Sequence, residues 1–201
     1  MSAVTTVVYP GTFDPITLGH EDVLRRAATL FGRVVVGVAK AHHKKTMFTL
    51  EQRMALVGSA LADMPNIEVQ AFDGLIVDFC TEHQAVGVVR GVRNHTDFDF
   101  EAQMAAMNRL LSPSFDTVVL LPQPQLQCIS STLVREISTL GGDVSGLVSP
   151  SAKRPVCMIV YERSRSFFGS NSGSAPTVTA TRLPKISTSS FVTAGSNSGN
   201  T

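Results

Sequence analysis

Residues 4–31 read VTTVVYPGTFDPITLGHEDVLRRAATLF, and this stretch decides the fold. Residues 4–9 are mostly β-branched or aromatic and are followed by Pro-Gly, which is typical of a short strand that ends in a turn. Residues 19–31 place Val, Ala and Leu at helical spacing with two arginines off that face. A strand, a polar loop and a helix in this order predict the first half of a β-α-β unit.

The same alternation continues along the chain. Further apolar runs of strand length lie at 34–39, 67–71, 86–90 and 117–121, and helical patterns lie at 49–61, 75–83, 97–111 and 131–140. Thr49 and Gln52 form a capping box at one helix start, and Gly141-Gly142 is typical of a helix end. Because the strands are continuous apolar runs, the sequence predicts an α/β fold, a doubly wound five-stranded parallel sheet with helices on both faces.

The domain predicted from this pattern covers residues 1–151. Residues 152–168 are ambiguous, because the run VCMIVY at 156–161 suits a further strand and a plain hydrophobic stretch equally well. In residues 169–201, 21 of 33 are Gly, Ser, Thr or Asn, and none is acidic. Such a segment cannot bury enough apolar surface to offset its ordering entropy, so we expect a disordered tail.

Charge and cysteine content narrow the class of protein. The net charge is +1, but residues 152–201 hold six Lys or Arg and one Glu, which leaves about −4 for residues 1–151. An acidic body argues against nucleic-acid binding. The chain has no apolar window of about 18 residues and no basic start, so we expect neither a membrane span nor a signal peptide. Cys80, Cys128 and Cys157 show no pairing pattern, which fits a reducing cytoplasm, and they are expected to be inert.

Polar side chains cluster at the predicted carboxyl ends of the strands, where doubly wound sheets bind ligands. The first turn holds Gly11-Thr12 and, at the following helix start, Gly19-His20, whereas GxGxxG and GxxxxGK[ST] are absent from it. A helix N-terminus with an imidazole beside it favours an anion, although a plain capping role for His20 is the alternative. Two guanidiniums in Arg90-Gly91-Val92-Arg93, after the fourth strand, also suit phosphate.

Four segments in this order resemble the bacterial phosphopantetheine adenylyltransferases, which belong to the HxGH-type nucleotidyltransferase superfamily. They are PGTFDPITLGH (10–20), with Thr17 in place of the first His, RGVR (90–93), DFDFEAQMAAMNRLL (97–111) and ISSTLVR (129–135). The resemblance covers about residues 4–150, and the short terminal helix usual in the family is replaced by a different sequence. It implies a Rossmann-like nucleotidyltransferase fold, and transfer of an adenylyl group from ATP to 4′-phosphopantetheine in a cytoplasmic homohexamer.

The resemblance also implies residue roles. His20 would stabilise the transition state of a direct in-line attack without a covalent intermediate, helped by Thr12, Lys44 and Arg93. The implied phosphopantetheine-binding residues are Thr12, Lys44, Leu75, Ile76, Arg90 and Asn108. The implied ATP-binding residues are Thr12, Phe13, His20, Gly91, Val92, Arg93, Glu101, Leu126, Gln127, Cys128, Ile129, Ser130, Ser131 and Thr132. Mg²⁺ would arrive with ATP rather than on protein side chains, and CoA would be a feedback ligand because it shares the pantetheine arm.

Three other functions stay open on the sequence. The acceptor could be another phosphate, such as nicotinate mononucleotide, or the transferred group a cytidylyl group. The chain could be a catalytically silent nucleotide- or CoA-binding module, or it could bind nucleic acid through its basic tail. Because every expected catalytic side chain is present, the enzyme is the favoured interpretation.

Some residues also have ordinary structural interpretations. Lys44 lies in a basic cluster typical of an exposed surface, and Lys45 could take its place. His42-His43 are adjacent, so their rings diverge, and no third ligand is near in sequence, which argues against a metal site. Glu101 could face solvent beside Arg109. Met104 and Met107 are typical of core or interface packing.

Overall fold

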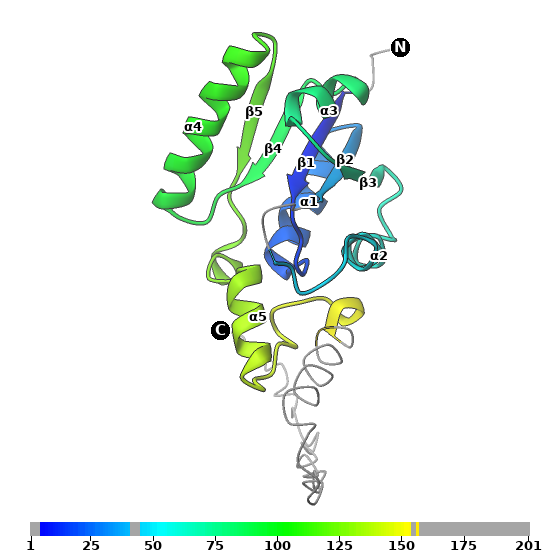
Figure 1. The fold of residues 1–201 in the computed structure, drawn as a ribbon, viewed down its shortest axis with the longest axis vertical. Coiled ribbons are helices and arrows are strands. Elements are labelled where there is room, and N and C mark those ends of the chain that lie inside the picture. The colour runs from blue at the N-terminus through cyan, green and yellow to red at the C-terminus, as the bar shows by residue number, and fades with distance from the viewer. Residues whose placement is uncertain (1–4, 41–44, 154–155, 157–201) are drawn as a thin grey trace, which may run out of the picture. The chain divides into compact units, whose positions relative to one another are not determined.

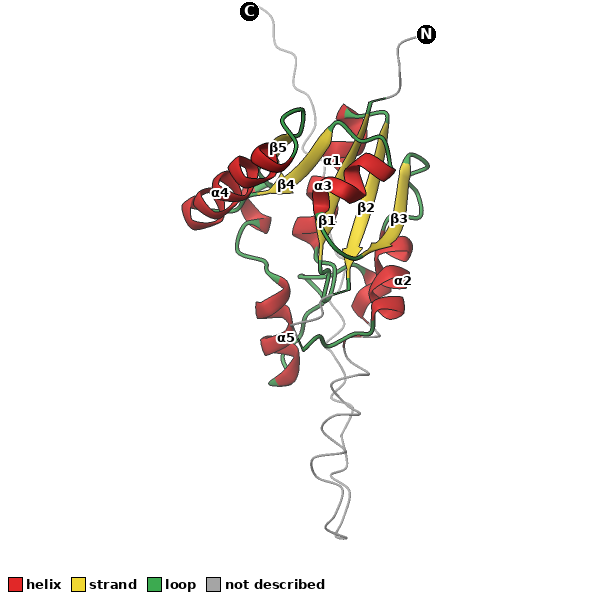
Figure 2. Cartoon of the chain, turned by 45° about the horizontal axis from the view of Figure 1, so that its top comes forward, coloured by secondary structure: helices red, strands yellow, loops and turns green. Residues whose placement is uncertain are grey.

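The computed structural model describes residues 5–40, 45–153 and 156. In this part of the chain, five parallel strands form one sheet in the order β3-β2-β1-β4-β5 (Figures 1 and 2). The strands are β1 (Thr6–Gly11), β2 (Arg33–Ala39), β3 (Ile67–Phe72), β4 (Gly87–Gly91) and β5 (Asp116–Leu120). The helices are α1 (Leu18–Leu30), α2 (Leu50–Ala60), α3 (Ile76–Glu82), α4 (His95–Leu111) and α5 (Ser131–Thr139), with a 3₁₀ turn η1 (Pro124–Leu126) that the sequence did not predict. Fold class and element order are confirmed.

Local sequence signals explain where helices begin and end. At the start of α2, Thr49 Oγ1 accepts the N–H of Gln52 at 3.3 Å, and Gln52 Oε1 accepts the N–H of Thr49 at 2.9 Å, so the predicted capping box forms. After α5, Gly141 has a φ of +81°. The N–H of Gly142 then reaches the carbonyl of Ile137 at 2.9 Å. This left-handed glycine cap closes the helix as predicted.

The two faces of the sheet are covered differently. Val7, Val34 and Val36 pack into the larger core cluster with side chains of α1, α2 and α5. Val8 and Val35, which point to the opposite face, pack with side chains of α3 in a smaller cluster. Helices therefore lie on both faces, as predicted. In both views α4 runs along β5 at the edge of the sheet, and α5 lies beyond the carboxyl ends of the strands (Figures 1 and 2).

The outer strands are less buried than continuous apolar runs suggested. In β5, Val118 and Val119 are both 37% exposed. Helix α4 buries only Glu101 and Asn108 and leaves most of its apolar side chains in solvent. The expectation of burial on both faces is therefore wrong for this edge, because a strand with one neighbour and one partial helix layer is not enclosed.

The sheet opens between β1 and β4. Strand β1 pairs with β2 along its whole length, from Thr6 opposite Arg33 to Gly11 opposite Val38. Among the described residues, its register with β4 is a single pair, Val8 opposite Val88. The chain also reverses its direction of winding here, since β2 and β3 lie on one side of β1 and β4 and β5 on the other. Doubly wound sheets bind ligands at such a switch point.

The core continues past the predicted domain boundary at residue 151. Residues 150–153 and 156 are helical. Ala152 and Val156 have no exposed surface and belong to the larger core cluster. The predicted divisions at 151 and 168 stay predictions, and the predicted tail at 169–201 lies outside the described residues.

Candidate active site

A cavity of about 500 Å³ lies at the carboxyl ends of β1 and β4. The predicted site residues that line it are Thr12, Phe13, His20, Arg90, Gly91, Arg93, Glu101, Ile129, Ser130, Ser131 and Thr132. Residues far apart in sequence thus meet at one place, as the topology predicted. The predicted residues that do not line it are Leu75, Ile76, Val92, Asn108, Leu126, Gln127 and Cys128. Lys44 lies outside the described residues, as do His42 and His43.

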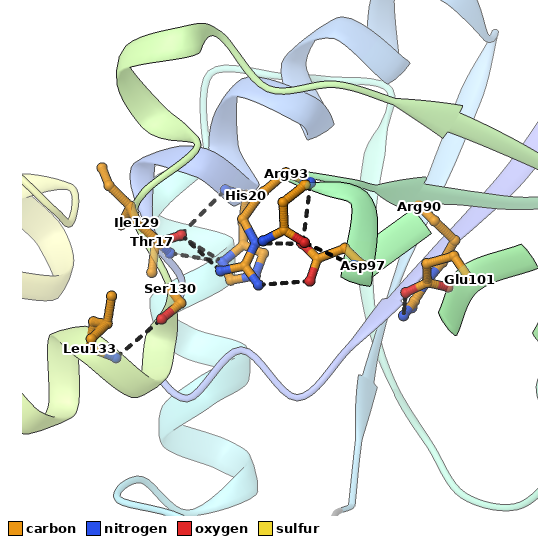
Figure 3. Close-up of polar contacts among 10 residues, drawn as sticks. Thr17, His20, Arg90, Arg93, Asp97, Glu101, Ile129, Ser130 and Leu133 are labelled. Carbon is orange, nitrogen blue, oxygen red and sulfur yellow. Dashed lines mark hydrogen bonds and ion pairs between the residues drawn. The ribbon is translucent and has the colours of Figure 1, made fainter. Parts of the chain in front are cut away.

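His20 is held by a capping box that sequence reasoning missed. Thr17 is the N-cap of α1, and its Oγ1 accepts the N–H of His20 at 3.4 Å. In return, the backbone N–H of Thr17 donates to His20 Nδ1 at 3.1 Å (Figure 3). Because a backbone N–H only donates, Nδ1 is the acceptor, and the proton of the neutral ring lies on Nε2. The signal was Thr-x-x-His at a helix start, with His taking the usual place of Glu or Gln.

The surroundings keep His20 neutral. Burial, and after it the charges of Arg93 and Arg90, lower the pKa of His20 from 6.5 to about 4. The ring also meets Phe13 edge-on, with ring centroids 5.4 Å apart. At neutral pH this histidine is therefore an uncharged hydrogen-bond donor through Nε2. The capping and the site-lining interpretations of His20 both hold.

Arg93 is fixed at the cavity wall by Asp97. Its Nε and Nη2 donate to the two carboxylate oxygens of Asp97 at 2.8 and 3.1 Å, and its Nη1 donates to the carbonyl of Ile129 at 3.4 Å (Figure 3). The hydrogen bond from Arg93 lowers the pKa of Asp97, and the hydrogen bond to Asp97 raises the pKa of Arg93. A bidentate pair of this kind orients the guanidinium with high precision.

Arg90 spans the opening between β1 and β4. Its Nη1 donates to the carbonyl of Pro10 in β1 at 2.9 Å, and its Nε donates to Glu101 Oε2 at 2.7 Å. Glu101 comes from α4, and its carboxylate meets the Arg90 guanidinium (Figure 3). The residue is 8% exposed. The alternative in which Glu101 faces solvent beside Arg109 is therefore wrong, because Arg109 pairs with Asp116 instead.

A smaller cavity of about 180 Å³ adjoins the main one. Arg90 and Glu101 line both cavities. Three residues of the smaller one, Ile76, Asn108 and Met104, come from α3 and α4. Two residues implied for phosphopantetheine, Ile76 and Asn108, thus lie here rather than in the main cavity. Leu75 is 54% exposed at the start of α3 and lines neither cavity.

The prediction that Met104 and Met107 pack in the core or at an interface is wrong for the core. Met104 and Met107 are 40% and 54% exposed, so neither is a core residue. Met104 borders the smaller cavity. The interface interpretation stays a prediction.

Asp14 and Arg53, which the sequence did not single out, hold the loops around Thr12. The carboxylate of Asp14 accepts the backbone N–H groups of Met47 and Phe48 at 2.8 and 2.9 Å, so it fixes the segment just after residues 41–44. Arg53 is 1% exposed and donates to the carbonyl of Thr12 at 2.6 Å and that of Ala39 at 2.8 Å. Burial lowers the pKa of Arg53. A buried arginine satisfied by backbone carbonyls has no sequence signature.

The start of α5 forms the far wall. Ser130 is the N-cap, and its Oγ accepts the N–H of Leu133 at 3.2 Å. Ser131 Oγ donates to the carbonyl of Pro15 at 2.8 Å, which ties this helix to the first loop. Ser130, Ser131 and Thr132 line the cavity, so the N-terminus of this helix, with its partial positive charge, borders it and suits an anion. The N-cap and anion-site interpretations of this cluster coexist, as expected.

Several other residues are placed away from the main cavity. Lys45 lines a separate cavity of about 410 Å³ beside α5. Cys80 is buried, which raises the pKa of its thiol to about 12, and Cys128 is exposed, while Cys157 lies outside the described residues. Within the described residues, no three His, Cys, Asp or Glu side chains gather to hold a metal ion. None of the helices in the described ranges is long and apolar enough to span a membrane.

The fold and the site together define a nucleotidyltransferase. The family model described as cytidylyltransferase-like matches residues 8–137. Among solved structures, the bifunctional NMN adenylyltransferase/ADP ribose pyrophosphatase from Francisella tularensis superposes with a TM-score of 0.61 at 14% identity, over 82% of this chain and 53% of that chain. At that identity the likeness concerns the fold.

Curated relatives narrow the assignment. The phosphopantetheine adenylyltransferase of Acidovorax sp. (strain JS42) is 60% identical over 143 residues, which are 71% of this chain and 87% of the relative. That of Janthinobacterium sp. (strain Marseille) is 50% identical over 151 residues, 75% of this chain and 94% of the relative. The chain belongs to the phosphopantetheine adenylyltransferase family.

Proposed function

We propose that this chain transfers the adenylyl group of ATP to 4′-phosphopantetheine and releases pyrophosphate and dephospho-CoA, a step of coenzyme A biosynthesis. The names of the curated relatives support this reaction. The observation that carries it is a neutral His20 with its Nε2 proton available, placed beside Arg90 and Arg93 in a cavity at the switch point.

In the proposed step, an oxygen of the phosphopantetheine phosphate attacks the α-phosphorus of ATP. A P–O bond forms on one side, and the bond from the α-phosphorus to the bridging oxygen breaks on the other, so that pyrophosphate carries that oxygen away. The attacking phosphate is ionised near neutral pH, so the step needs no general base. Catalysis then consists of positioning and of stabilising the charge that develops at the α-phosphate.

The candidate catalytic residues have the following parts in this proposal. His20 donates from Nε2 to an α-phosphate oxygen and, being neutral, keeps its proton throughout. Arg93 holds the triphosphate from one wall, and the N–H groups at the start of α5 hold it from another. Thr12 orients the attacking phosphate, and Lys44, after β2, bridges the two reacting phosphates.

The two cavities suggest a place for each substrate. The main cavity, which contains His20 and the start of α5, would take ATP with its Mg²⁺. The smaller cavity, lined by Ile76 and Asn108, would take the pantetheine arm. Arg90 lies between them and would contact the phosphate that joins the two substrates.

Pyrophosphate release tests the reaction. The purified full-length chain is incubated with MgATP, with and without 4′-phosphopantetheine. Strict dependence on phosphopantetheine is expected. Turnover with nicotinate mononucleotide or with CTP in place of these substrates would contradict the proposal, and ATP binding without turnover on any acceptor would indicate a silent nucleotide-binding protein.

The stereochemistry at phosphorus tests the absence of a covalent intermediate. A single in-line displacement inverts the configuration at the α-phosphorus, whereas a covalent enzyme intermediate would require two displacements and give net retention. One diastereomer of ATPαS is the suitable substrate. Inversion is expected in the dephospho-CoA analogue.

Assembly and feedback are part of the same proposal. We expect a homohexamer in the cytoplasm, and apolar side chains exposed on α4, such as Phe100 and Leu110, give surface for subunit contacts. Light scattering coupled to gel filtration measures the mass. CoA is expected to compete with phosphopantetheine because both carry the pantetheine arm, and inhibition kinetics with varied phosphopantetheine measure this competition.

A further inference from the structure

Two side chains of α1 hold the loop that joins β5 to α5. Asp22 Oδ2 accepts the backbone N–H of Gln123 at 3.1 Å. One turn further along the helix, Arg26 Nη1 donates to the carbonyl of Leu121. The Asp22 and Arg26 side chains also form an ion pair at 3.7 Å, and the Asp22 side chain is 9% exposed. The proposed mechanism uses neither residue.

The loop that they hold is a wall of the main cavity. Pro122, between the two anchored peptide groups, lines that cavity, as does Ile129 at the other end of the loop. Gln127 Nε2 donates to the carbonyl of Pro122 at 3.2 Å and closes the loop on itself. The loop also lies against the start of α1, because a Cβ added to Gly19 would come within 3.4 Å of the Leu126 carbonyl oxygen.

One helix therefore carries His20 and also fixes this part of the cavity wall. Asp22 follows His20 by two residues and Arg26 by six, on a rigid element. The spacing between His20 and the peptide groups at 121–123 then depends on two side-chain contacts rather than on the loop alone. A ligand that contacts both His20 and these peptide groups would meet them at a fixed spacing.

We infer that Asp22 and Arg26 are positioning residues for the nucleotide: they hold the 121–123 backbone in place so that ATP binds against it in register with His20. This inference rests on the proposed function, because it concerns the ATP part of the same site. Neither side chain lines the cavity, so their action is through the loop.

The chain offers a matched control on the same helix. Arg25 precedes Arg26 and makes the same kinds of bonds, to Asp63 at 2.6 Å and to the carbonyl of Ala60 at 3.0 Å. These partners lie at the end of α2 and just after it, and neither belongs to the loop that joins β5 to α5. Arg25→Ala therefore removes an equivalent arginine without changing the anchoring of residues 121–123.

The test compares ATP affinity and kinetics of the full-length chain and its variants. Asp22→Ala and Arg26→Ala are expected to raise the Kd and the KM for ATP about five- to tenfold, a factor of the size given by the loss of one ordinary hydrogen bond. The KM for phosphopantetheine should change less than twofold. Asp22→Asn keeps an acceptor oxygen for Gln123 and should restore most of the affinity. Arg25→Ala should leave ATP affinity unchanged.

Hydrogen exchange separates this inference from the proposed function. The Gln123 amide should exchange faster in Asp22→Ala than in Asp22→Asn, whichever reaction the chain catalyses. If the wild type binds ATP but releases no pyrophosphate, the proposed function fails, and the order of ATP affinities still decides the inference. ATP affinities equal to that of Arg25→Ala, or equal rises in both KM values, would overturn the inference. A wild type that binds no ATP would overturn both.

Discussion

The backbone N–H of Thr17 donates to Nδ1 of His20 at 3.1 Å, so the residue that begins α1 also selects the tautomer of the histidine. Nδ1 is occupied as an acceptor, and Nε2 carries the proton. A side chain that ordinarily titrates near neutrality thereby becomes a fixed, uncharged donor. Three of the predictions below follow from this contact and from the burial of the ring.

Replacing His20 by Ala is expected to lower the rate of adenylyl transfer by about 10²–10³-fold. ATP binding should change much less, since the proposed hydrogen bond strengthens only in the transition state. Single-turnover rates and ATP titrations measure the two effects. His95→Ala is the control, because this side chain is 88% exposed on α4. An unchanged rate in His20→Ala would refute the assignment.

The pKa of His20 should lie far below that of an ordinary histidine. With a native pKa of about 4 against 6.5 for an unfolded chain, the unfolded state binds more protons between these values. The contribution to the free energy of unfolding is therefore complete above pH 6.5 and falls as the pH drops toward 4. NMR titration of the ring Cε1–H measures the native pKa. A midpoint near 6.5 would contradict the geometry described for the ring.

Thr17→Val keeps the shape of the side chain and removes its hydroxyl. The N-cap bond to His20 is lost, so the free energy of unfolding should fall by about 1 kcal/mol. The rate should fall too, because the imidazole loses the hydrogen bond between Thr17 Oγ1 and His20 Nδ1 at 2.9 Å, which helps to orient it. Thr17→Ser is the matched variant and should retain both. Denaturant unfolding and turnover measured on the same samples test this, and a Ser variant as impaired as Val would point to lost methyl packing instead.

Glu21 is a buried carboxylate with one oxygen, Oε1, that has no hydrogen-bond partner. Burial raises its pKa. The native state therefore binds more protons than the unfolded state just above pH 4.5, and stability falls as the pH rises through the raised pKa. Glu21→Gln should raise the Tm at pH 8 and flatten this dependence. Glu51→Gln, at the exposed start of α2, is the control. A lower Tm for Glu21→Gln at pH 8 would show that the charge is favourable where it is.

Two deletions separate the core from the tail. Removing residues 169–201 is expected to leave Tm and rate near those of the full chain, because their composition lacks the apolar content for packing. Removing residues 150–201 also takes away Ala152 and Val156, which are wholly buried. This deletion should lower the free energy of unfolding by at least about 2 kcal/mol. Thermal unfolding of the two truncated chains measures the difference. A large loss in the shorter deletion would make the tail structural.

The element order was predictable because apolar runs of strand length alternated with helical patterns, and some helices carried added signals, such as Thr49 with Gln52 or the glycines after α5. The location of the site followed from topology, since parallel strands bring their carboxyl ends together. What the sequence did not contain was pairing between distant elements. Arg90 and Glu101 were both selected, but their contact depends on how α4 returns over β4. Arg53 and Asp14 act on backbone groups, which every residue has, and so left no pattern.

The exposure of β5 shows a second limit. Val118 and Val119 look like core residues in one dimension, and an apolar run does not tell an edge strand from a central one. Thr17 shows a third limit. It was noticed as a departure from the HxGH motif, while its role lay in the spacing to His20.

The opening between β1 and β4 has a consequence for ligands that bind in the two cavities. Beyond the paired residues Val8 and Val88, the Arg90 side chain donates to the Pro10 carbonyl across the opening. The same side chain borders both the main and the smaller cavity. Pro10, Phe72 and Glu101 line both cavities together with Arg90. Ligands bound in the two cavities would therefore border the same guanidinium.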